Sequence, residues 1–413
     1  MIRSMYSAVS GLRAHQTMMD VVGNNIANVN THGFKKSDAI FQDVLSQTLN
    51  GAGAPTQALG GTNAAQIGLG ARVGAIAQNL LQGALQNTGR DLDLALQGDG
   101  FFSIEESGAQ LYSRAGSFFV DANGNLVNND GGFVQGWTAD PTGALATSSP
   151  AGRITIPVGE QVAPIITSEI NLGGNLPSEA VIGATQVSSL AVYDSQGARI
   201  DLELTFTKTA VNAWNLTAAY GNPPSAVAVS DSALTFGTDG RIVSPADFNA
   251  NIAAGSIPNV GDIALTLGGV GVSSEVTQLA ASGSVSAVTQ DGSTTGQLIG
   301  VSVGQDGIIT GAYSNGQVKP IAQVAIATFA NPEGLERVSG TKWRESVNSG
   351  LAQIGVASTG GRGQVAPGTL EMSNVDLAEE FTTLIRTQRG FQANSRVITT
   401  SDEMLQEVVN LKR

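Results

Sequence analysis

Apolar residues recur every three, four or seven positions near the start of the chain. Gln16 and Gly23 interrupt this stripe, and Asn28, Asn30 and Gly33 follow it with residues that commonly end helices. Side chains at such intervals share one face of a helix, so the pattern predicts an N-terminal α-helix with an apolar face. The stripe is formed by Ile2, Met5, Val9, Leu12, Met19 and Ile26.

A longer stripe runs from about residue 375 to residue 411. The neighbouring row of this stripe is apolar only at its ends, and such a half-polar row is typical of helices that pack against several neighbours. A helix that lies on its own domain shows the same spacing, so both interpretations stay open here. The apolar row is Leu377, Leu384, Phe391, Ile398 and Leu405, and the half-polar row is Phe381, Gln388, Ser395, Asp402 and Val409.

The two stripes predict helices at both ends of the chain whose apolar faces suit contacts with neighbouring helices in an assembly. Such helices gain most of their stability from packing their apolar face, so we expect both ends to be disordered in the monomer and ordered on assembly. The predicted assembly residues are Met5, Val9, Leu12, Met19 and Ile26 in the first helix, and Leu377, Phe381, Leu384, Phe391, Ile398, Leu405 and Val409 in the second.

Between the ends, the pattern is that of β-structure. Seven Asn-Gly or Asp-Gly pairs lie between residues 99 and 316, and such pairs favour the tight turns of β-hairpins. Residues 200–206 alternate between apolar and polar side chains, which predicts a strand with one buried face. The expected fold class is therefore mixed and mainly β, with discontinuous β domains nested between two long helices.

Composition predicts where these parts meet, because domain boundaries favour exposed Pro, Gly and polar stretches. Stretches of this kind at 50–70, 141–150 and 280–296 predict one β domain inserted into another. The predicted parts are a terminal helical domain (1–30 with 374–413), an extended linker region (31–70 with 360–373), an inner β domain (71–146 with 296–359) and an inserted outer β domain (147–295).

The charge is concentrated in the middle of the chain. The net charge of the whole chain is −13. The first 36 residues carry +3 and the last 40 carry −1, so residues 37–373 carry a net charge of −15. An acidic body argues against binding to nucleic acid or to an anionic membrane. No apolar run is long enough to span a membrane, and the N-terminus lacks the apolar core of a cleaved signal peptide.

Residues for catalysis or metal binding are scarce. The chain has no Cys, which excludes thiolate chemistry and disulfides, and its two histidines are His15 on the first predicted helix and His32 in a turn. The adjacent pairs Glu105-Glu106 and Glu379-Glu380 diverge and cannot clamp a substrate together. The turn at 121–125 lacks the downstream Glu of a calcium loop. We therefore predict no catalytic residue, no cofactor and no metal site.

Three stretches resemble the flagellar axial proteins, the rod and hook family. The first is Asn24-Asn25-Ile26-Ala27-Asn28-Val29-Asn30-Thr31-His32-Gly33-Phe34-Lys35, where Asn24, Asn25, Asn28, Gly33, Phe34 and Lys35 carry the likeness. The second is Gly98–Phe102 with Tyr112–Phe118 and Asp121–Leu126. The third runs from Leu370–Leu377 into Gln388–Arg396. Residues 329–335 and 343–346, with the predicted insertion, are similar to the hook branch of the family.

The resemblance implies a structural subunit that polymerises into a curved hollow tube, with terminal helices that pair as a coiled coil inside and β domains outside. It implies a flexible joint between motor and filament, located outside the cell and exported by the flagellar export apparatus without a cleaved signal. The implied partners are copies of the chain itself, the distal rod protein, the hook cap and the hook–filament junction protein. The alternatives are a distal rod or other axial subunit, a secreted β-rich adhesin or binding module and, as the weakest, an enzyme.

Overall fold

The structure is a computed structural model that describes residues 2–55, 60–159, 161–245, 249–268 and 275–410. The chain forms two compact units. Unit 1 contains residues 1–156, 301–310 and 320–413, and unit 2 contains residues 157–300 and 311–319. The chain thus leaves unit 1 twice, for residues 157–300 and again for residues 311–319, so unit 2 is inserted between segments of unit 1.

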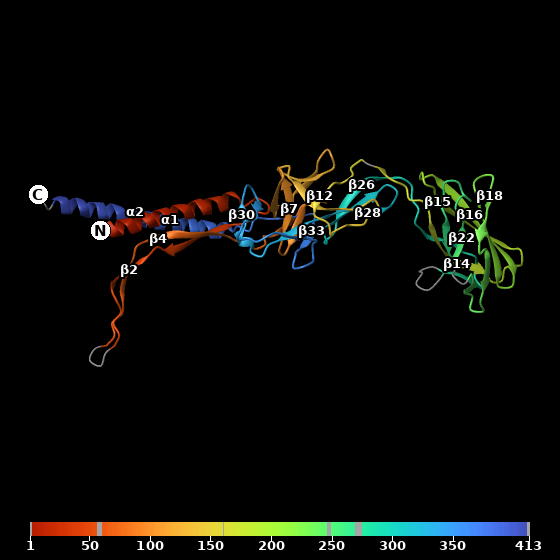
Figure 1. Cartoon of the computed structure of the whole chain (residues 1–413), viewed down its shortest axis with the longest axis horizontal. Helices are drawn as coiled ribbons and strands as arrows, with labels where there is room; N and C mark the ends of the chain where they lie inside the picture. Colours follow the sequence, from red (N-terminus) through yellow and green to blue (C-terminus); the bar gives the residue numbers. More distant parts are fainter. Residues whose placement is uncertain (1, 56–59, 160, 246–248, 269–274, 411–413) are drawn as a thin grey trace. The chain divides into compact units, whose positions relative to one another are not determined.

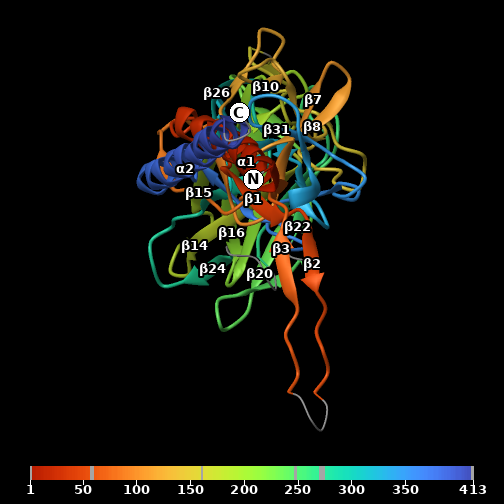
Figure 2. The same cartoon turned by 90° about the vertical axis from the view of Figure 1, so that its left-hand side faces the viewer.

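Two helices of unit 1 pack along each other, and both figures show them together (Figures 1 and 2). Helix α1 spans Ile2–Ala27 and α2 spans Leu377–Asn410, which agrees with the predicted positions of the terminal helices. Asp376 caps α2, because its side chain accepts a hydrogen bond from the Ala378 amide at 2.8 Å. The prediction of a mainly β chain with paired terminal helices is confirmed.

A narrow β-ribbon follows α1, and its first part packs against that helix. The strands β1 (Ser37–Asp43) and β4 (Ala71–Gln78) pair antiparallel, and β2 (Ser46–Asn50) pairs with β3 (Ala65–Gly68) farther out. Figure 2 shows the β2–β3 hairpin extending away from the helices. Residues 31–70, predicted as an extended linker, hold the strands β1, β2 and β3, whose backbone groups pair in ladders although their side chains are mostly exposed.

The rest of unit 1 is a β-domain around a large sheet and two short strand pairs, β5–β34 and β6–β33. The aromatic part of its core joins Phe101, Tyr112, Phe329 and Trp343 in edge-to-face contacts. Its elements are β5 (Leu85–Asn87), β6 (Leu94–Gln97), β7 (Phe101–Glu106), β8 (Ala109–Ser113), β9 (Phe118–Val120), β10 (Leu126–Asn128), β11 (Phe133–Thr138), β12 (Gly152–Arg153), β28 (Val318–Val324), β29 (Ile326–Thr328), the 3₁₀ helix η1 (Pro332–Gly334), β30 (Glu336–Arg337), β31 (Lys342–Arg344), β32 (Gln353–Gly355), β33 (Gln364–Pro367) and β34 (Thr369–Glu371).

Unit 2 is built from two six-stranded sheets that enclose one apolar core. The predicted strand at 200–206 lies within β16, where Leu202, Leu204 and Phe206 are fully buried and Asp201 and Glu203 are exposed. Its elements are β13 (Gln161–Val162), β14 (Glu169–Pro177), β15 (Thr185–Tyr193), β16 (Arg199–Ala210), β17 (Ala213–Tyr220), β18 (Ser225–Val227), β19 (Val229–Ser230), β20 (Ala233–Phe236), β21 (Ile242–Ser244), β22 (Asn249–Ile252), β23 (Ile263–Thr266), β24 (Val276–Leu279) and β25 (Ser286–Gln290). The strands β26 (Gly296–Val303), β27 (Ile308–Tyr313) and β28 have residues in both units.

Candidate assembly site at the helix junction

The stretch that ends α1 and the stretch that begins α2 meet in unit 1. The Gly33 amide donates a hydrogen bond to the Glu371 carbonyl oxygen at 2.8 Å. Gly33 has φ +70°, and a Cβ there would lie 2.5 Å from the Ala115 amide nitrogen. Only glycine fits this position without moving the neighbouring backbone. The turn after α1 is thereby fixed against two distant segments of the chain.

A buried charge cluster lies beside this turn. Lys35 Nζ lies 2.6 Å from Glu371 Oε1 and donates to the Leu81 carbonyl at 2.8 Å, and the side chains of Lys35 and Glu371 are 1% and 0% exposed. Arg114 Nη1 lies 3.6 Å from the other oxygen of Glu371. Burial lowers the pKa of both Lys35 and Arg114, and the charge of Glu371 opposes this effect. One buried carboxylate therefore compensates two buried cations.

A second layer of polar contacts ties the start of α2 to the ribbon. Asn374 accepts a hydrogen bond from the Lys36 amide at 2.8 Å and donates one to the Asn79 carbonyl at 2.8 Å. Lys36 Nζ lies 2.9 Å from Glu379 Oε2. Although burial alone would lower the pKa of Lys36, its hydrogen bond to Glu379 and the surrounding carboxylates raise it.

Asn25 and Glu380 close the junction inside the helix pair. Asn25 is 1% exposed and exchanges two hydrogen bonds with the Ser37 backbone, at 2.9 and 3.1 Å. Glu380 is 3% exposed, and burial raises its pKa, while the Asn25 side chain and the charge of Lys36 oppose the rise. A carboxylate in a helix seam is unfavourable for pairing when it is ionised.

The other residues of the N-terminal stretch support the end of α1. Asn28 donates from its side chain to the Asn24 carbonyl at 2.9 Å, which extends the last turn. Phe34 is 1% exposed, and the Arg337 guanidinium lies 4.5 Å from its ring centre. Asn24 is exposed, whereas Asn25, Gly33, Phe34 and Lys35 are buried. Sequence reasoning placed these residues and Glu371 in separate stretches of the resemblance, but it did not predict that Glu371 contacts Gly33 and Lys35.

The helix seam differs from the predicted stripe by one residue in each helix. The row Met5, Leu12, Met19 and Ile26 is half-buried, as is the row Leu384, Phe391, Ile398 and Leu405. Beside this row in α1, Ala8 and Val22 are buried and His15 is half-buried; of the predicted second row, Val9 is half-buried, whereas Gln16 and Gly23 are exposed. The second row of α2 is Glu380, Thr387, Asn394 and Ser401, not Phe381, Gln388, Ser395, Asp402 and Val409.

The close approach of the two helices explains this shift. A Cβ on Gly390 would lie 2.6 Å from the His15 ring, and one on Gly11 would lie 2.7 Å from Asn394 Nδ2. Small side chains face the partner helix because they let the backbones come together. Of the predicted assembly residues, Leu377, Phe381 and Val409 remain 41%, 50% and 68% exposed in a single copy. Their role in assembly stays a prediction.

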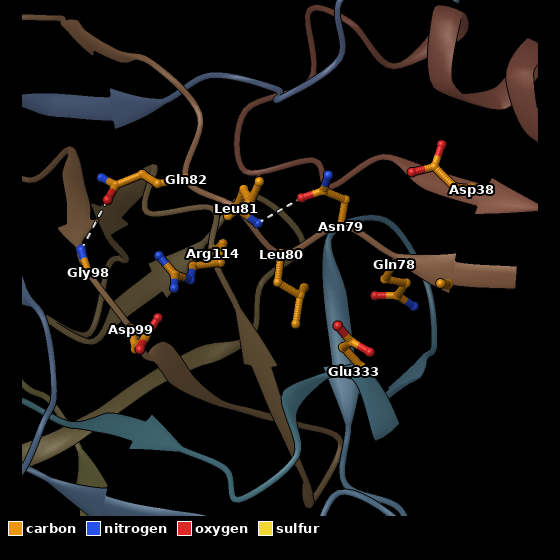
Figure 3. A pocket seen from close by; sticks show the side chains of 11 residues that line it. Asp38, Gln78, Asn79, Leu80, Leu81, Gln82, Gly98, Asp99, Arg114 and Glu333 are labelled. Atoms are coloured by element: carbon orange, nitrogen blue, oxygen red, sulfur yellow. Dashed lines mark hydrogen bonds between the residues drawn. The ribbon is translucent and has the colours of Figure 1, made fainter. Parts of the chain in front are cut away.

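A cavity of about 510 Å³ opens beside the junction in unit 1 (Figure 3). The Arg114 side chain lies between Leu81 and Asp99 in this view. Arg114 is 4% exposed, and its Nε and Nη1 atoms lack a hydrogen-bond partner. Asp38, Asp99 and Glu333 are exposed carboxylates of the lining. The cavity thus combines a buried guanidinium with an acidic rim.

The described residues hold no group of three or more His, Asp or Glu side chains arranged to bind a metal ion. Within the same ranges, no helix is long and apolar enough to cross a membrane. The fold and the junction are those of a structural subunit: paired terminal helices, an exposed ribbon and nested β domains, with a buried charge cluster at the helix junction.

Family models cover most of the chain. They are described as flagella basal body rod protein (residues 5–35), flagellar hook protein FlgE/F/G D1 domain (95–175), flagellar basal body protein FlaE D2 domain (175–293) and flagellar basal body rod FlgEFG protein C-terminal (366–411). The stretches of the sequence that resemble the family lie mostly inside these matches.

Two full-length relatives bear the name flagellar hook protein FlgE. The protein of Borreliella burgdorferi is 41% identical, with 100% of both chains covered, and that of Escherichia coli is 35% identical, with 98% of this chain and 99% of the relative covered. A flagellar basal-body rod protein FlgG of Bacillus subtilis is 33% identical, with 100% of both covered. The chain therefore belongs to the flagellar hook and basal-body rod protein family.

A solved structure agrees with this assignment at the level of the fold. The crystal structure of Helicobacter pylori flagellar hook protein FlgE2 aligns with a TM-score of 0.54 at 14% identity. The alignment covers 70% of this chain and 100% of the solved chain.

Proposed function

We propose that this chain is the structural subunit of a bacterial flagellar hook, and that it polymerises into a curved hollow tube which acts as a flexible joint between rod and filament. The observation that carries the proposal is the full-length identity of 41% to a protein named flagellar hook protein FlgE. The family is one of structural proteins, and the proposal assigns the chain no catalytic activity.

The helix pair supports polymerisation because it is incomplete in one copy. Phe381, Ile385, Met404 and Val409 are all at least half exposed on α2, and Tyr6 is 69% exposed on α1. Such side chains stabilise a helix only when another surface covers them. An open polymer supplies that surface through a heterologous contact, in which one patch meets a different patch of the next copy.

Limited proteolysis of the purified monomer, read by mass spectrometry, tests the mechanism. We expect rapid cleavage within roughly the first 30–70 and last 40 residues, because ends with few buried apolar contacts open first. The trimmed core should then no longer form tubes. Protease-resistant ends in a dilute monomer, or tubes formed by the trimmed core, would contradict assembly through the terminal helices.

A distal rod subunit is the second candidate, and the full-length identity of 33% to a protein named flagellar basal-body rod protein FlgG favours it. Tube curvature separates the two candidates. Replacing residues 157–300 of unit 2 by a short Gly/Ser linker should give straight, stiffer tubes if exchangeable contacts between outer domains allow the hook to bend. Straight tubes from the unaltered chain would favour the rod.

The specific partners follow from the same proposal. The tube would begin on the distal rod protein, grow beneath the hook cap and end at the hook–filament junction protein. Its subunits would travel through the flagellar export apparatus to the outside of the cell. Pull-down of each purified partner with the full chain tests these contacts one by one, and a partner that fails to bind is removed from the list.

A further inference from the structure

The cavity beside the helix junction has the chemistry of a docking site. Its rim carries Asp38, Asp99 and Glu333, and Arg114 lies at its base. Glu371 is shared between Arg114 and Lys35, and the exposed Asp99 supplies a further negative charge to the Arg114 guanidinium. Two of its nitrogens lack a hydrogen-bond partner although the residue is 4% exposed. An occupant should therefore present cations to the rim and a hydrogen-bond acceptor to the base.

Helix α2 presents such a pattern on its outer surface. Residues 381–401 contain Arg386, Arg389 and Arg396 but no Asp or Glu. All three arginines are exposed, and Gln392 is exposed between two of them. Positions 389, 392 and 396 follow the three- and four-residue spacing of one helix face. This face, the 389–396 stripe, presents guanidinium, amide and guanidinium in that order.

The stripe cannot reach the cavity of its own chain. The start of α2 is fixed beside that cavity, because Asn374 donates to the carbonyl of Asn79, one of the lining residues. Gln392 lies fifteen residues beyond the first residue of α2, Leu377. At 1.5 Å per residue, it is roughly 22 Å away along the helix. The stripe and the cavity can therefore meet only between two copies.

We propose that the 389–396 stripe of one copy docks into the junction cavity of a second copy. The Gln392 amide oxygen accepts from the Arg114 guanidinium, and Arg389 and Arg396 pair with carboxylates of the rim. This contact is heterologous, so it propagates an open polymer instead of closing a dimer. The inference rests on the proposed function, since it names one contact of the polymer.

Engineered cysteines test the contact, and the chain has no Cys of its own to interfere. One preparation carries Asp99→Cys and another carries Gln392→Cys, and each is mixed as a minor fraction with unaltered chain before assembly and mild oxidation. We expect a disulfide between the two variants in tubes and none in the dilute monomers. Ala393→Cys, also exposed but turned by about 100° around the helix, is the matched control and should couple far less.

Charge reversal provides a test that does not depend on disulfide geometry. Asp99→Arg and Arg396→Asp should each raise the critical concentration for assembly about tenfold, because each places like charges together. An equal mixture of the two single variants should recover most of this loss, because the reversed stripe of one variant then meets the reversed rim of the other. Far-UV circular dichroism of each variant shows whether it has folded.

The outcomes separate the contact from the function. Tubes in which Gln392→Cys couples no better than Ala393→Cys, together with reversal variants that do not rescue each other, overturn the contact and leave the proposed function intact. An unaltered chain that forms no tubes at all contradicts the proposed function itself.

Discussion

The core of unit 2 and the helix pair of unit 1 differ in how they bury their apolar side chains. Unit 2 buries large apolar side chains completely, among them Phe206, Leu204 and Trp214. The helix pair buries Ala8, Ala14, Val22 and a polar row, and leaves Phe381 and Val409 exposed. Unit 2 has an apolar core of its own, whereas the helix pair would, under the proposed function, gain its remaining stability from other copies. The chain thus combines a domain whose apolar side chains are buried within one copy and a helix pair whose apolar side chains are partly exposed in one copy.

The largest effect should come from opening the core of unit 2. Phe206→Ala removes a fully buried ring and should lower the free energy of unfolding of unit 2 by about 3–5 kcal/mol. Urea unfolding followed by hydrogen exchange of unit 2 peptides measures the loss. The matched control is Val211→Ala, which changes a side chain that is 81% exposed and should shift the same value by less than about 0.5 kcal/mol. Comparable losses in both variants would contradict a self-sufficient core.

The buried cluster at the junction should be nearly as sensitive. Glu371→Gln leaves Lys35 as a buried cation without its ion-pair partner and leaves Arg114 with only the charge of Asp99 beside it, which should cost about 3–5 kcal/mol of local stability. Hydrogen exchange of residues 79–87 reports the change. Glu336→Gln is the control, because it breaks an exposed pair with Arg344 that is worth about 0–1 kcal/mol. Unchanged protection in Glu371→Gln would show that the cluster does not hold the junction together.

The helix seam should respond to a single methyl group. Ala is the better helix former, yet Gly390→Ala places a Cβ 2.6 Å from the His15 ring and should destabilise pairing by about 1–3 kcal/mol. Gly23→Ala meets nothing within 4 Å and should instead stabilise α1 by up to about 1 kcal/mol. The temperature at which assembled tubes dissociate should fall for the first variant and rise for the second. Shifts of the same sign would place the seam elsewhere.

The smallest expected effect is a pH dependence at Glu380. Burial raises its folded pKa above the ordinary value of 4.5, so the paired helices hold this proton to higher pH than the unfolded chain does. Its contribution to pairing is fully present below pH 4.5 and is lost as the pH rises through the raised pKa. Compared with the unaltered chain, Glu380→Gln should retain more tube stability above that pKa. Identical pH profiles would rule out a seam carboxylate.

The sequence predicted the ends and the class of fold because these rest on periodicity and turn chemistry. It predicted the strand at 200–206 for the same reason, since Leu202, Leu204 and Phe206 alternate with polar residues. In α2, hydrophobicity pointed to Phe381, which is exposed, whereas close approach of the helices selects the buried Glu380; in α1, hydrophobicity gave no sign of the buried Ala8. The size of the side chain and the distance between the two backbones decide which residues face the partner helix, and a pattern of apolar positions does not reveal either of them.

The junction residues show a second limit. Gly33 and Lys35 were named from the resemblance, but their shared partner Glu371 is 336 positions from Lys35. No local pattern predicts which of many carboxylates a buried lysine will meet. The cavity at Arg114 was not predicted either, because its lining comes from separate segments that only folding brings together.

The ion pair between Lys35 and Glu371 joins the two ends of a segment that contains most of the chain, so this segment forms one closed loop. The entropic cost of closing a loop grows only with the logarithm of its length, so a longer segment between Lys35 and Glu371 would weaken this ion pair very little. New material can therefore be spliced into the middle while the ends keep their geometry. The β16–β17 turn is a natural place for such cargo, with Val211 81% exposed and Asn212 at φ +58°. A lattice of these subunits would then display that cargo at every subunit position.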